Sequence, residues 1–317
     1  MRTPETFFSR RRFLQLGAGT ATGLWAAGNV PRALAGSAKT LKNIGVQLYT
    51  VRDLMPKDAP GTLKALAGLG YKEVEVIGRN LDQLAPELQR VGLKPISMHI
   101  EAALVTGNRE TLKAIAARFN FPMLPDDYTL SSAIANAKKH GVEYLVVSYL
   151  FPQERGGADF YRQFADQMNR AGEQCRAAGL KLCYHNHAFE FAPVESIIPF
   201  DLFMERFDAR LVSWEMDVFW IAMGGQDPAV TLRKYKGRVP LVHLKDKAKA
   251  IAGQTDEAKV PPTAFAEVGN GGLNFAEILR AAEEAGVRHY FVEQDQTAGN
   301  PLDSLRQSYA YLNKLNF

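Results

Sequence analysis

The sequence predicts an α/β fold, a (β/α)8 TIM barrel, and three observations support that prediction. Eight short apolar runs are rich in β-branched residues, helical patterns separate them, and 317 residues with 46% hydrophobic side chains suffice for one large core. Alternating strands and helices favour parallel pairing, because each return to the same edge of a sheet needs a crossover. The predicted strands are Ile44–Leu48, Glu73–Ile77, Pro95–Met98, Tyr144–Val147, Lys181–Tyr184, Leu211–Met216, Val239–Leu244 and Tyr290–Val292.

Helix boundaries recur with these strands. Six of the strands follow closely after a glycine that ends a helical run. Glycine is common at this position because the residue after the last helical turn often adopts a positive φ. Asp58, Asp159, Asp227 and Asn274 stand at expected helix starts. An open doubly wound sheet is the alternative, but the first strand-to-helix turn, 49–53, lacks a dinucleotide glycine fingerprint.

The first 35 residues look like an export signal rather than part of the barrel. The run Ser9-Arg10-Arg11-Arg12-Phe13-Leu14 resembles a twin-arginine motif, and a weakly apolar stretch with four glycines follows it up to Ala33-Leu34-Ala35. A disordered arm and a membrane-anchoring helix are the alternatives. We predict cleavage after residue 35, a single barrel domain over 36–317, and a periplasmic or extracytoplasmic protein with no membrane contact after cleavage.

The charge balance argues against a nucleic-acid partner. The chain has 38 basic and 34 acidic side chains, and removing the five Arg and one Glu of residues 1–35 leaves 33 of each. Nucleic-acid-binding proteins usually carry a basic excess. A small molecule is therefore the expected partner. A disulfide between Cys175 and Cys183 and assembly into a homo-oligomer both stay open.

Ionisable side chains gather where the predicted strands end. The carboxyl ends of all strands in a barrel open onto one mouth, so side chains from distant parts of the chain meet there. Imidazole and carboxylate groups together suit Zn²⁺, Mn²⁺ or Co²⁺, and suit Mg²⁺ less well. The residues concerned are His99, His185, His187, His243, Asp217, Glu293, Asp295, Asp246 and, further back in its strand, Glu75.

Five motifs occur in order along the chain: Val46–Arg52 (VQLYTVR), Tyr184–His187 (YHNH), Asp217–Trp220 (DVFW), His243–Asp246 (HLKD) and Val292-Glu293. As a set they resemble the xylose isomerase-like TIM-barrel family of sugar phosphate isomerases and epimerases. The resemblance implies one divalent metal ion, Mn²⁺ or Zn²⁺ first and Co²⁺ or Mg²⁺ as alternatives, held by Asp217, His243 and Glu293. The family's fourth ligand, a Glu after the fifth strand, is here replaced by His185.

The resemblance implies a metal-dependent sugar isomerase or epimerase that abstracts a proton next to a carbonyl and forms a metal-stabilised enediolate. Glu293 is the first candidate base, His187 or His185 handles the second proton, and Lys245 holds an anionic oxygen or pairs with Asp246 or Glu215. The candidate substrate-binding residues are Glu75, His99, Asn186, Trp220 and Tyr49.

Two other functions stay open. A lyase or hydratase acting on 3-keto sugars or glycosides would use the same enediolate and expel a β-substituent, and the replaced glutamate and the predicted export both suit it. A non-catalytic barrel would bind carbohydrate without exchanging any carbon-bound proton.

A long connection, 245–272, has no clear period and is expected at the mouth of the barrel. Its last residues, Gly269-Asn270-Gly271-Gly272, precede a helix capped by Asn274 and could hold a phosphate. The alternative is a flexible loop into a capped helix. The predicted export favours a neutral sugar or an oxidised glycoside over a phosphate ester.

Overall fold

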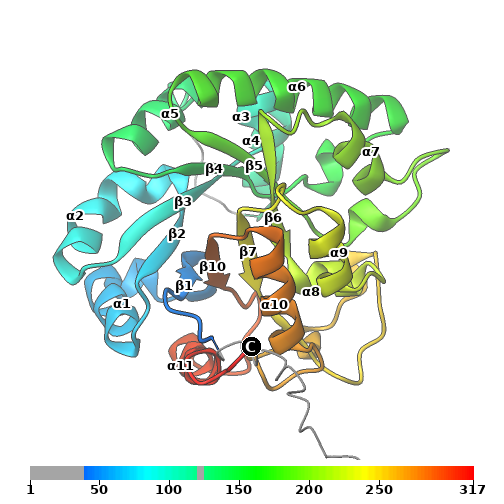
Figure 1. Cartoon of the computed structure of the whole chain (residues 1–317). Coiled ribbons are helices and arrows are strands. Elements are labelled where there is room, and N and C mark those ends of the chain that lie inside the picture. Colours follow the sequence, from blue (N-terminus) through cyan, green and yellow to red (C-terminus); the bar gives the residue numbers. More distant parts are fainter. Residues whose placement is uncertain (1–38, 120–124) are drawn as a thin grey trace, which may run out of the picture. The chain divides into compact units, whose positions relative to one another are not determined.

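The computed structural model describes residues 39–119 and 125–317, and within them the strands form a closed parallel barrel (Figure 1). Around the barrel the strands follow the order β1-β10-β7-β6-β5-β4-β3-β2. The predicted (β/α)8 barrel is confirmed, and all eight predicted strands are present. Their bounds are β1 Gly45–Gln47, β2 Glu73–Ile77, β3 Lys94–Ile100, β4 Tyr144–Val147, β5 Lys181–His185, β6 Val212–Asp217, β7 Leu241–Leu244 and β10 His289–Val292.

The helices lie outside the ring of strands (Figure 1). Asp227 and Asn274 cap helices through their side chains as predicted, and Asp58 caps the second part of a kinked first helix by accepting from the Gly61 N–H at 2.8 Å. The helices are α1 Met55–Leu69, α2 Leu81–Val91, α3 Ala103–Thr106, α4 Arg109–Phe119, α5 Leu130–Lys139, α6 Ala158–Ala177, α7 Pro199–Arg206, α8 Val218–Met223, α9 Pro228–Lys234, α10 Phe275–Ala285 and α11 Pro301–Leu312.

Barrel closure depends on a glycine. Gly45 of β1 pairs with Phe291 of β10, and a Cβ added at Gly45 would lie 2.5 Å from the Phe291 ring. Any larger residue would therefore push the first and last strands apart. Phe291 can then fill the barrel interior with side chains from four other strands. This interior cluster consists of Ile96, Tyr144, Val146, Cys183, Leu241 and Phe291.

The two cysteines are buried free thiols on different sides of the barrel wall. Cys183 belongs to the interior cluster, whereas Cys175 on α6 belongs to the layer between strands and helices. The sequence left a disulfide between Cys175 and Cys183 open, and in this structure the two residues form none.

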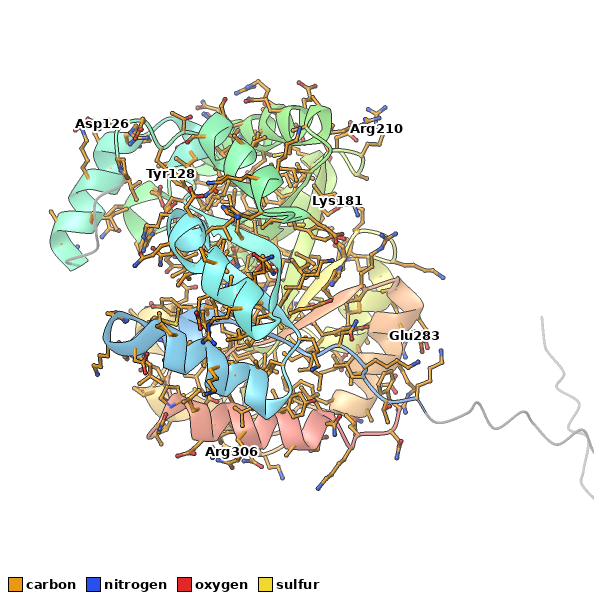
Figure 2. The ribbon with its side chains drawn as sticks, turned by 90° about the vertical axis from the view of Figure 1, so that its left-hand side faces the viewer. Asp126, Tyr128, Lys181, Arg210, Glu283 and Arg306 are labelled. Atoms are coloured by element: carbon orange, nitrogen blue, oxygen red, sulfur yellow. The ribbon has the colours of Figure 1, made fainter. Side chains whose placement is uncertain are left out.

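Arg210, Glu283 and Arg306, labelled in Figure 2, are charged side chains exposed on the outer surface. No helix of the described residues is long and apolar enough to span a bilayer. The predicted export signal at 1–35 lies outside the described residues, so the signal, its cleavage and the periplasmic location stay predictions.

Candidate metal centre

The four predicted metal ligands meet at the carboxyl ends of four strands. His185 and Asp217 are the last residues of β5 and β6, His243 lies in β7, and Glu293 directly follows β10. Asp217 pairs in register with His243, which brings two of the ligands side by side. Each of the four offers a donor atom, and these atoms all lie within 4.8 Å of one another.

One nitrogen of each histidine faces the two carboxylates. His243 Nδ1 lies 3.0 Å from Glu293 Oε2 and 3.9 Å from Asp217 Oδ2, and His185 Nε2 lies 3.9 Å from the same Asp217 oxygen. All four side chains are buried. Two imidazole nitrogens and two carboxylate oxygens at this spacing form a donor set of the kind that holds Zn²⁺ or Mn²⁺.

The opposite nitrogen of each histidine contacts a second pair of carboxylates. His185 Nδ1 lies 3.0 Å from Glu215 Oε2, and His243 Nε2 lies 2.6 Å from Glu75 Oε2. A metal-bound histidine commonly donates its other N–H to a carboxylate, which fixes the tautomer and the orientation of the ring. Glu215 and Glu75 therefore leave His185 Nε2 and His243 Nδ1 free to act as ligands. A second possible group of donors, His99, His185, Glu215 and His243, shares the same two imidazoles.

An ammonium group stands beside the metal-facing carboxylates. Lys245 is fully buried, and its Nζ lies 3.0 Å from Asp217 Oδ2, 2.7 Å from Glu293 Oε2 and 2.6 Å from Asp295 Oδ2. Burial alone would lower the pKa of Lys245, but these three carboxylates raise it well above its ordinary value. Lys245 is thus a fixed positive charge, and its predicted partners Asp246 and Glu215 are wrong.

A buried carboxylate oxygen without a hydrogen bond supports a divalent cation at this site. Asp217 Oδ2 is buried and accepts no hydrogen bond, although Lys245 Nζ is its charged neighbour. Burial alone would raise the pKa of Glu293, but the charges of Lys245 and His243 hold it well below its usual value. Glu293 therefore stays ionised, as a ligand must.

A cavity of about 460 Å³ opens above this centre. Five of the predicted catalytic and substrate-binding residues line it: Tyr49, His99, His187, Trp220 and Glu293. His185 lines it as well. The loop-borne side chains Glu257, Val260, Pro262 and Phe265 form another part of its wall, so the long connection lies at the barrel mouth as predicted.

Comparison with known proteins assigns the family. A family model described as xylose isomerase-like TIM barrel matches residues 63–315. The chain belongs to this family.

Its relatives include dehydratases and isomerase-like proteins. Inosose dehydratase 2 of Bacillus cereus is 26% identical over 251 residues, which cover 75% of this chain and 83% of that protein. The match to an inosose dehydratase of Geobacillus thermodenitrificans, 28% identical, spans only about half of each protein, 46% of this chain and 52% of the relative.

Solved structures share the barrel. A sugar phosphate isomerase/epimerase from Parabacteroides distasonis superposes with a TM-score of 0.67 at 26% identity, over 87% of this chain and 95% of that one. The IolI protein, solved with a bound zinc atom, has a TM-score of 0.62 at 14% identity over 87% of this chain and 99% of its own, which shows the shared fold.

Three of the predicted catalytic and substrate-binding residues of this xylose isomerase-like barrel do not line the cavity, and neither do the predicted metal ligands Asp217 and His243. Glu75 is fully buried and accepts hydrogen bonds from Gln47 Nε2 at 2.7 Å and from His243. Asn186 Oδ1 accepts from the Trp214 indole at 2.9 Å and from a backbone N–H, so its amide oxygen is committed within the protein. Lys245, the third, is held by carboxylates. These contacts place Glu75, Asn186 and Lys245 behind the cavity wall.

Sequence reasoning missed the carboxylate that orients His185. Glu215 lies two residues before Asp217 on β6, and alternate residues of a strand point to the same face. That spacing could have identified it as an inward-facing residue. Burial, followed by the charge of Glu75, raises the pKa of Glu215 to about 7.

Proposed function

We propose that this chain is a metal-dependent lyase that abstracts the proton next to the carbonyl of a 3-keto sugar or glycoside and expels the neighbouring β-substituent. The relatives named inosose dehydratases support a lyase, since a dehydratase expels water. The observation that carries the proposal is the state of His187.

Of the four histidines at the mouth of the barrel, His187 is the one whose ring has no hydrogen-bonding partner in the described part of the chain. Among the described residues its Nδ1 has no partner, whereas His99, His185 and His243 each contact buried carboxylates. The ring packs between Tyr149 and Trp220, at centroid distances of 4.6 and 5.2 Å, and lines the cavity. The ring is therefore held in place by packing, and its Nδ1 is not committed to a hydrogen bond within the described protein.

The protonation state of His187 suits a base. Burial, together with the charge of Lys245, lowers the pKa of His187 well below its ordinary value. The imidazole is therefore neutral near pH 7 and can accept a proton. Glu293, the first candidate base from the sequence, instead has the surroundings of a ligand.

The chain's residues can then carry out an elimination. His187 accepts the proton from C2 of a 3-keto glycoside, and the electron pair of that C–H bond is first delocalised onto the carbonyl oxygen. As the carbonyl re-forms, the pair becomes the C1–C2 double bond and the bond from C1 to its oxygen breaks. His187 returns the proton to the departing oxygen, which leaves an unsaturated ketone and an alcohol. When bound by His185, Asp217, His243 and Glu293, a divalent cation supplies Lewis acidity for the charge that develops on the carbonyl oxygen.

One proton-transferring group is enough for this reaction, because the proton removed from carbon is the proton that the leaving oxygen needs. The fifth-strand position, where the resemblance implies a glutamate, carries His185, which Glu215 holds at 3.0 Å. An isomerase or epimerase is the second candidate, supported by the likeness to the Parabacteroides distasonis protein. It would use the same proton abstraction without losing a substituent.

The test uses the metal-loaded protein with the 3-keto derivative of p-nitrophenyl glucoside in D₂O. A lyase releases p-nitrophenol. An isomerase or epimerase incorporates deuterium at C2 and releases nothing, and that result would overturn the elimination. If neither change occurs while the sugar still binds, the barrel is a binding protein.

A pair of variants isolates the role of His187. His187→Gln should lose at least 100-fold in rate, within the range for a general base, while metal content stays unchanged. His140→Gln, which alters a histidine paired with Asp82, should react like the wild type. Full activity of His187→Gln would assign the base elsewhere.

A further inference from the structure

A cradle of backbone N–H groups lies just before α10. The N–H groups of Gly269 and Gly271 point at Asp246 Oδ2, at 3.0 and 2.9 Å, and that of Leu273 points at Oδ1 at 3.1 Å. The N–H of Lys247 adds a fourth donor at 2.8 Å. Converging backbone donors at a helix start are an arrangement that binds phosphate groups in other barrels.

In this chain the cradle is already filled. Asp246 is fully buried, and a Cβ placed on Gly271 would lie 2.3 Å from its carboxylate oxygen. A phosphate group therefore has no room beside Asp246. The sequence suggested that Gly269–Gly272 could hold a substrate phosphate, and the structure corrects this, because an internal carboxylate takes that position.

The same carboxylate orders part of the cavity wall. Asp246 and Lys247 form β8 (Asp246–Lys247), which pairs antiparallel with β9 (Phe265–Ala266). The Gly272 N–H closes the loop by donating to the Lys247 carbonyl at 2.7 Å. Phe265 of β9 lines the cavity. The cradle thus holds the chain that carries Phe265 without help from a ligand.

The cavity lining is also unfavourable to an anion. Its carboxylates are Glu101, Glu257, Glu293 and Asp295. Its one guanidinium among the described lining residues, Arg79, is paired with Glu101. The buried Lys245 is shared among three carboxylates. Glu257 is likewise paired with Arg155. These side-chain cations are therefore already paired with carboxylates and are not free to bind a phosphate ester, whereas carboxylates and hydroxyl groups make good hydrogen bonds.

We propose that the substrate is uncharged, an inference that rests on the proposed function. Asp246 is a built-in anion at the position where a barrel of this kind would otherwise bind the phosphate group of a substrate. Asp246 acts as a specificity-determining and positioning residue, not as a group that touches the reacting atoms.

The test restores the missing anion from solution. Thermal unfolding of Asp246→Ala is measured in sodium phosphate, in sodium formate and in sodium chloride at equal ionic strength. We expect Asp246→Ala to melt lower than the wild type and to regain roughly 2–4 °C or more in phosphate or formate relative to chloride. If neither anion restores stability, or if the wild type gains as much, the cradle is not an anion site and the proposal fails.

Asp227→Ala is the matched control. Asp227 caps α9 through a single backbone contact, to the Val230 N–H at 2.9 Å. Its loss should lower the melting temperature without any response to phosphate or formate, because one N–H does not form a cradle.

A second measurement does not depend on the variant folding. Glucose 6-phosphate and inorganic phosphate are titrated into the metal-loaded wild type by calorimetry. We expect no saturable binding up to millimolar concentration, and saturable binding of the ester would overturn the proposal. Neither measurement requires turnover, so failure of the lyase assay and failure of this inference are distinguishable.

Discussion

Histidine orientation is decided by single carboxylates behind the metal centre. Glu215 and Glu75 contact the histidine nitrogens that face away from Asp217 and Glu293. The sequence identified the four ligands because strand ends in a barrel converge, whatever the details of the side chains. It could not identify their partners, since rotamers and tautomers depend on packing across the barrel.

Replacing Glu215 tests this arrangement. We expect Glu215→Gln to weaken Zn²⁺ affinity by about 10–100-fold, because the neutral amide no longer supports the basicity of His185. Calorimetric titration of Zn²⁺ into the metal-free protein measures this affinity. Glu87→Gln, at a surface pair with Arg90, is the control. Equal affinity in both variants would mean that Glu215 does not support the ligand.

The buried carboxyl group of Glu190 makes the folding stability depend on pH. Burial raises the pKa of Glu190 to about 8 from an ordinary 4.5, and the group accepts hydrogen bonds from Tyr184 and the His187 N–H. A carboxyl with a raised folded-state pKa binds its proton more tightly when folded. Its contribution is therefore fully present at acid pH and is lost as the pH rises from about 4.5 to about 8.

The variant Glu190→Gln mimics the protonated group. Its melting temperature should fall less than that of the wild type between pH 5 and 8. Parallel pH profiles of the two proteins would show that Glu190 is ionised when folded.

At the scale of elements, regular structure was predictable and irregular structure was not. Strands and helix caps follow from local patterns, and the structure confirms all eight strands. The connection 245–272 has no period, so nothing local announced that β8 and β9 would pair or that Asp246 would bind the glycine-rich turn. Those contacts join residues 23 to 27 positions apart, namely Asp246 with Gly269, Gly271 and Leu273.

Phe265 tests the wall that this connection builds. Its ring stacks on Phe219 at a 4.5 Å centroid distance and meets the edge of Trp220 at 5.9 Å. Phe265→Ala should cost less than the roughly 3–5 kcal/mol of a fully buried Phe, because the residue is half-buried. It should still raise KM, since Trp220 loses its support. Denaturant unfolding and steady-state kinetics measure the two effects, and an unchanged KM would show that the wall does not contact substrate.

At the scale of the whole molecule, the barrel joins four ligands from distant parts of the chain, so metal binding and folding are coupled. A cation that binds only the folded state stabilises it by about 2.7 kcal/mol at a concentration of 100 Kd. We expect chelation to lower the melting temperature of the wild type and to leave Asp217→Asn almost unchanged. Equal responses of the two proteins would place the stabilising ion elsewhere.

Anomalous X-ray diffraction from crystals of the Zn²⁺-loaded protein tests the central claim most directly. We predict one strong anomalous peak within about 2.0–2.2 Å of His185 Nε2, Asp217 Oδ2, His243 Nδ1 and Glu293 Oε2. A peak coordinated by His99 and Glu215 instead, or no peak between these four residues at full metal loading, would contradict the account.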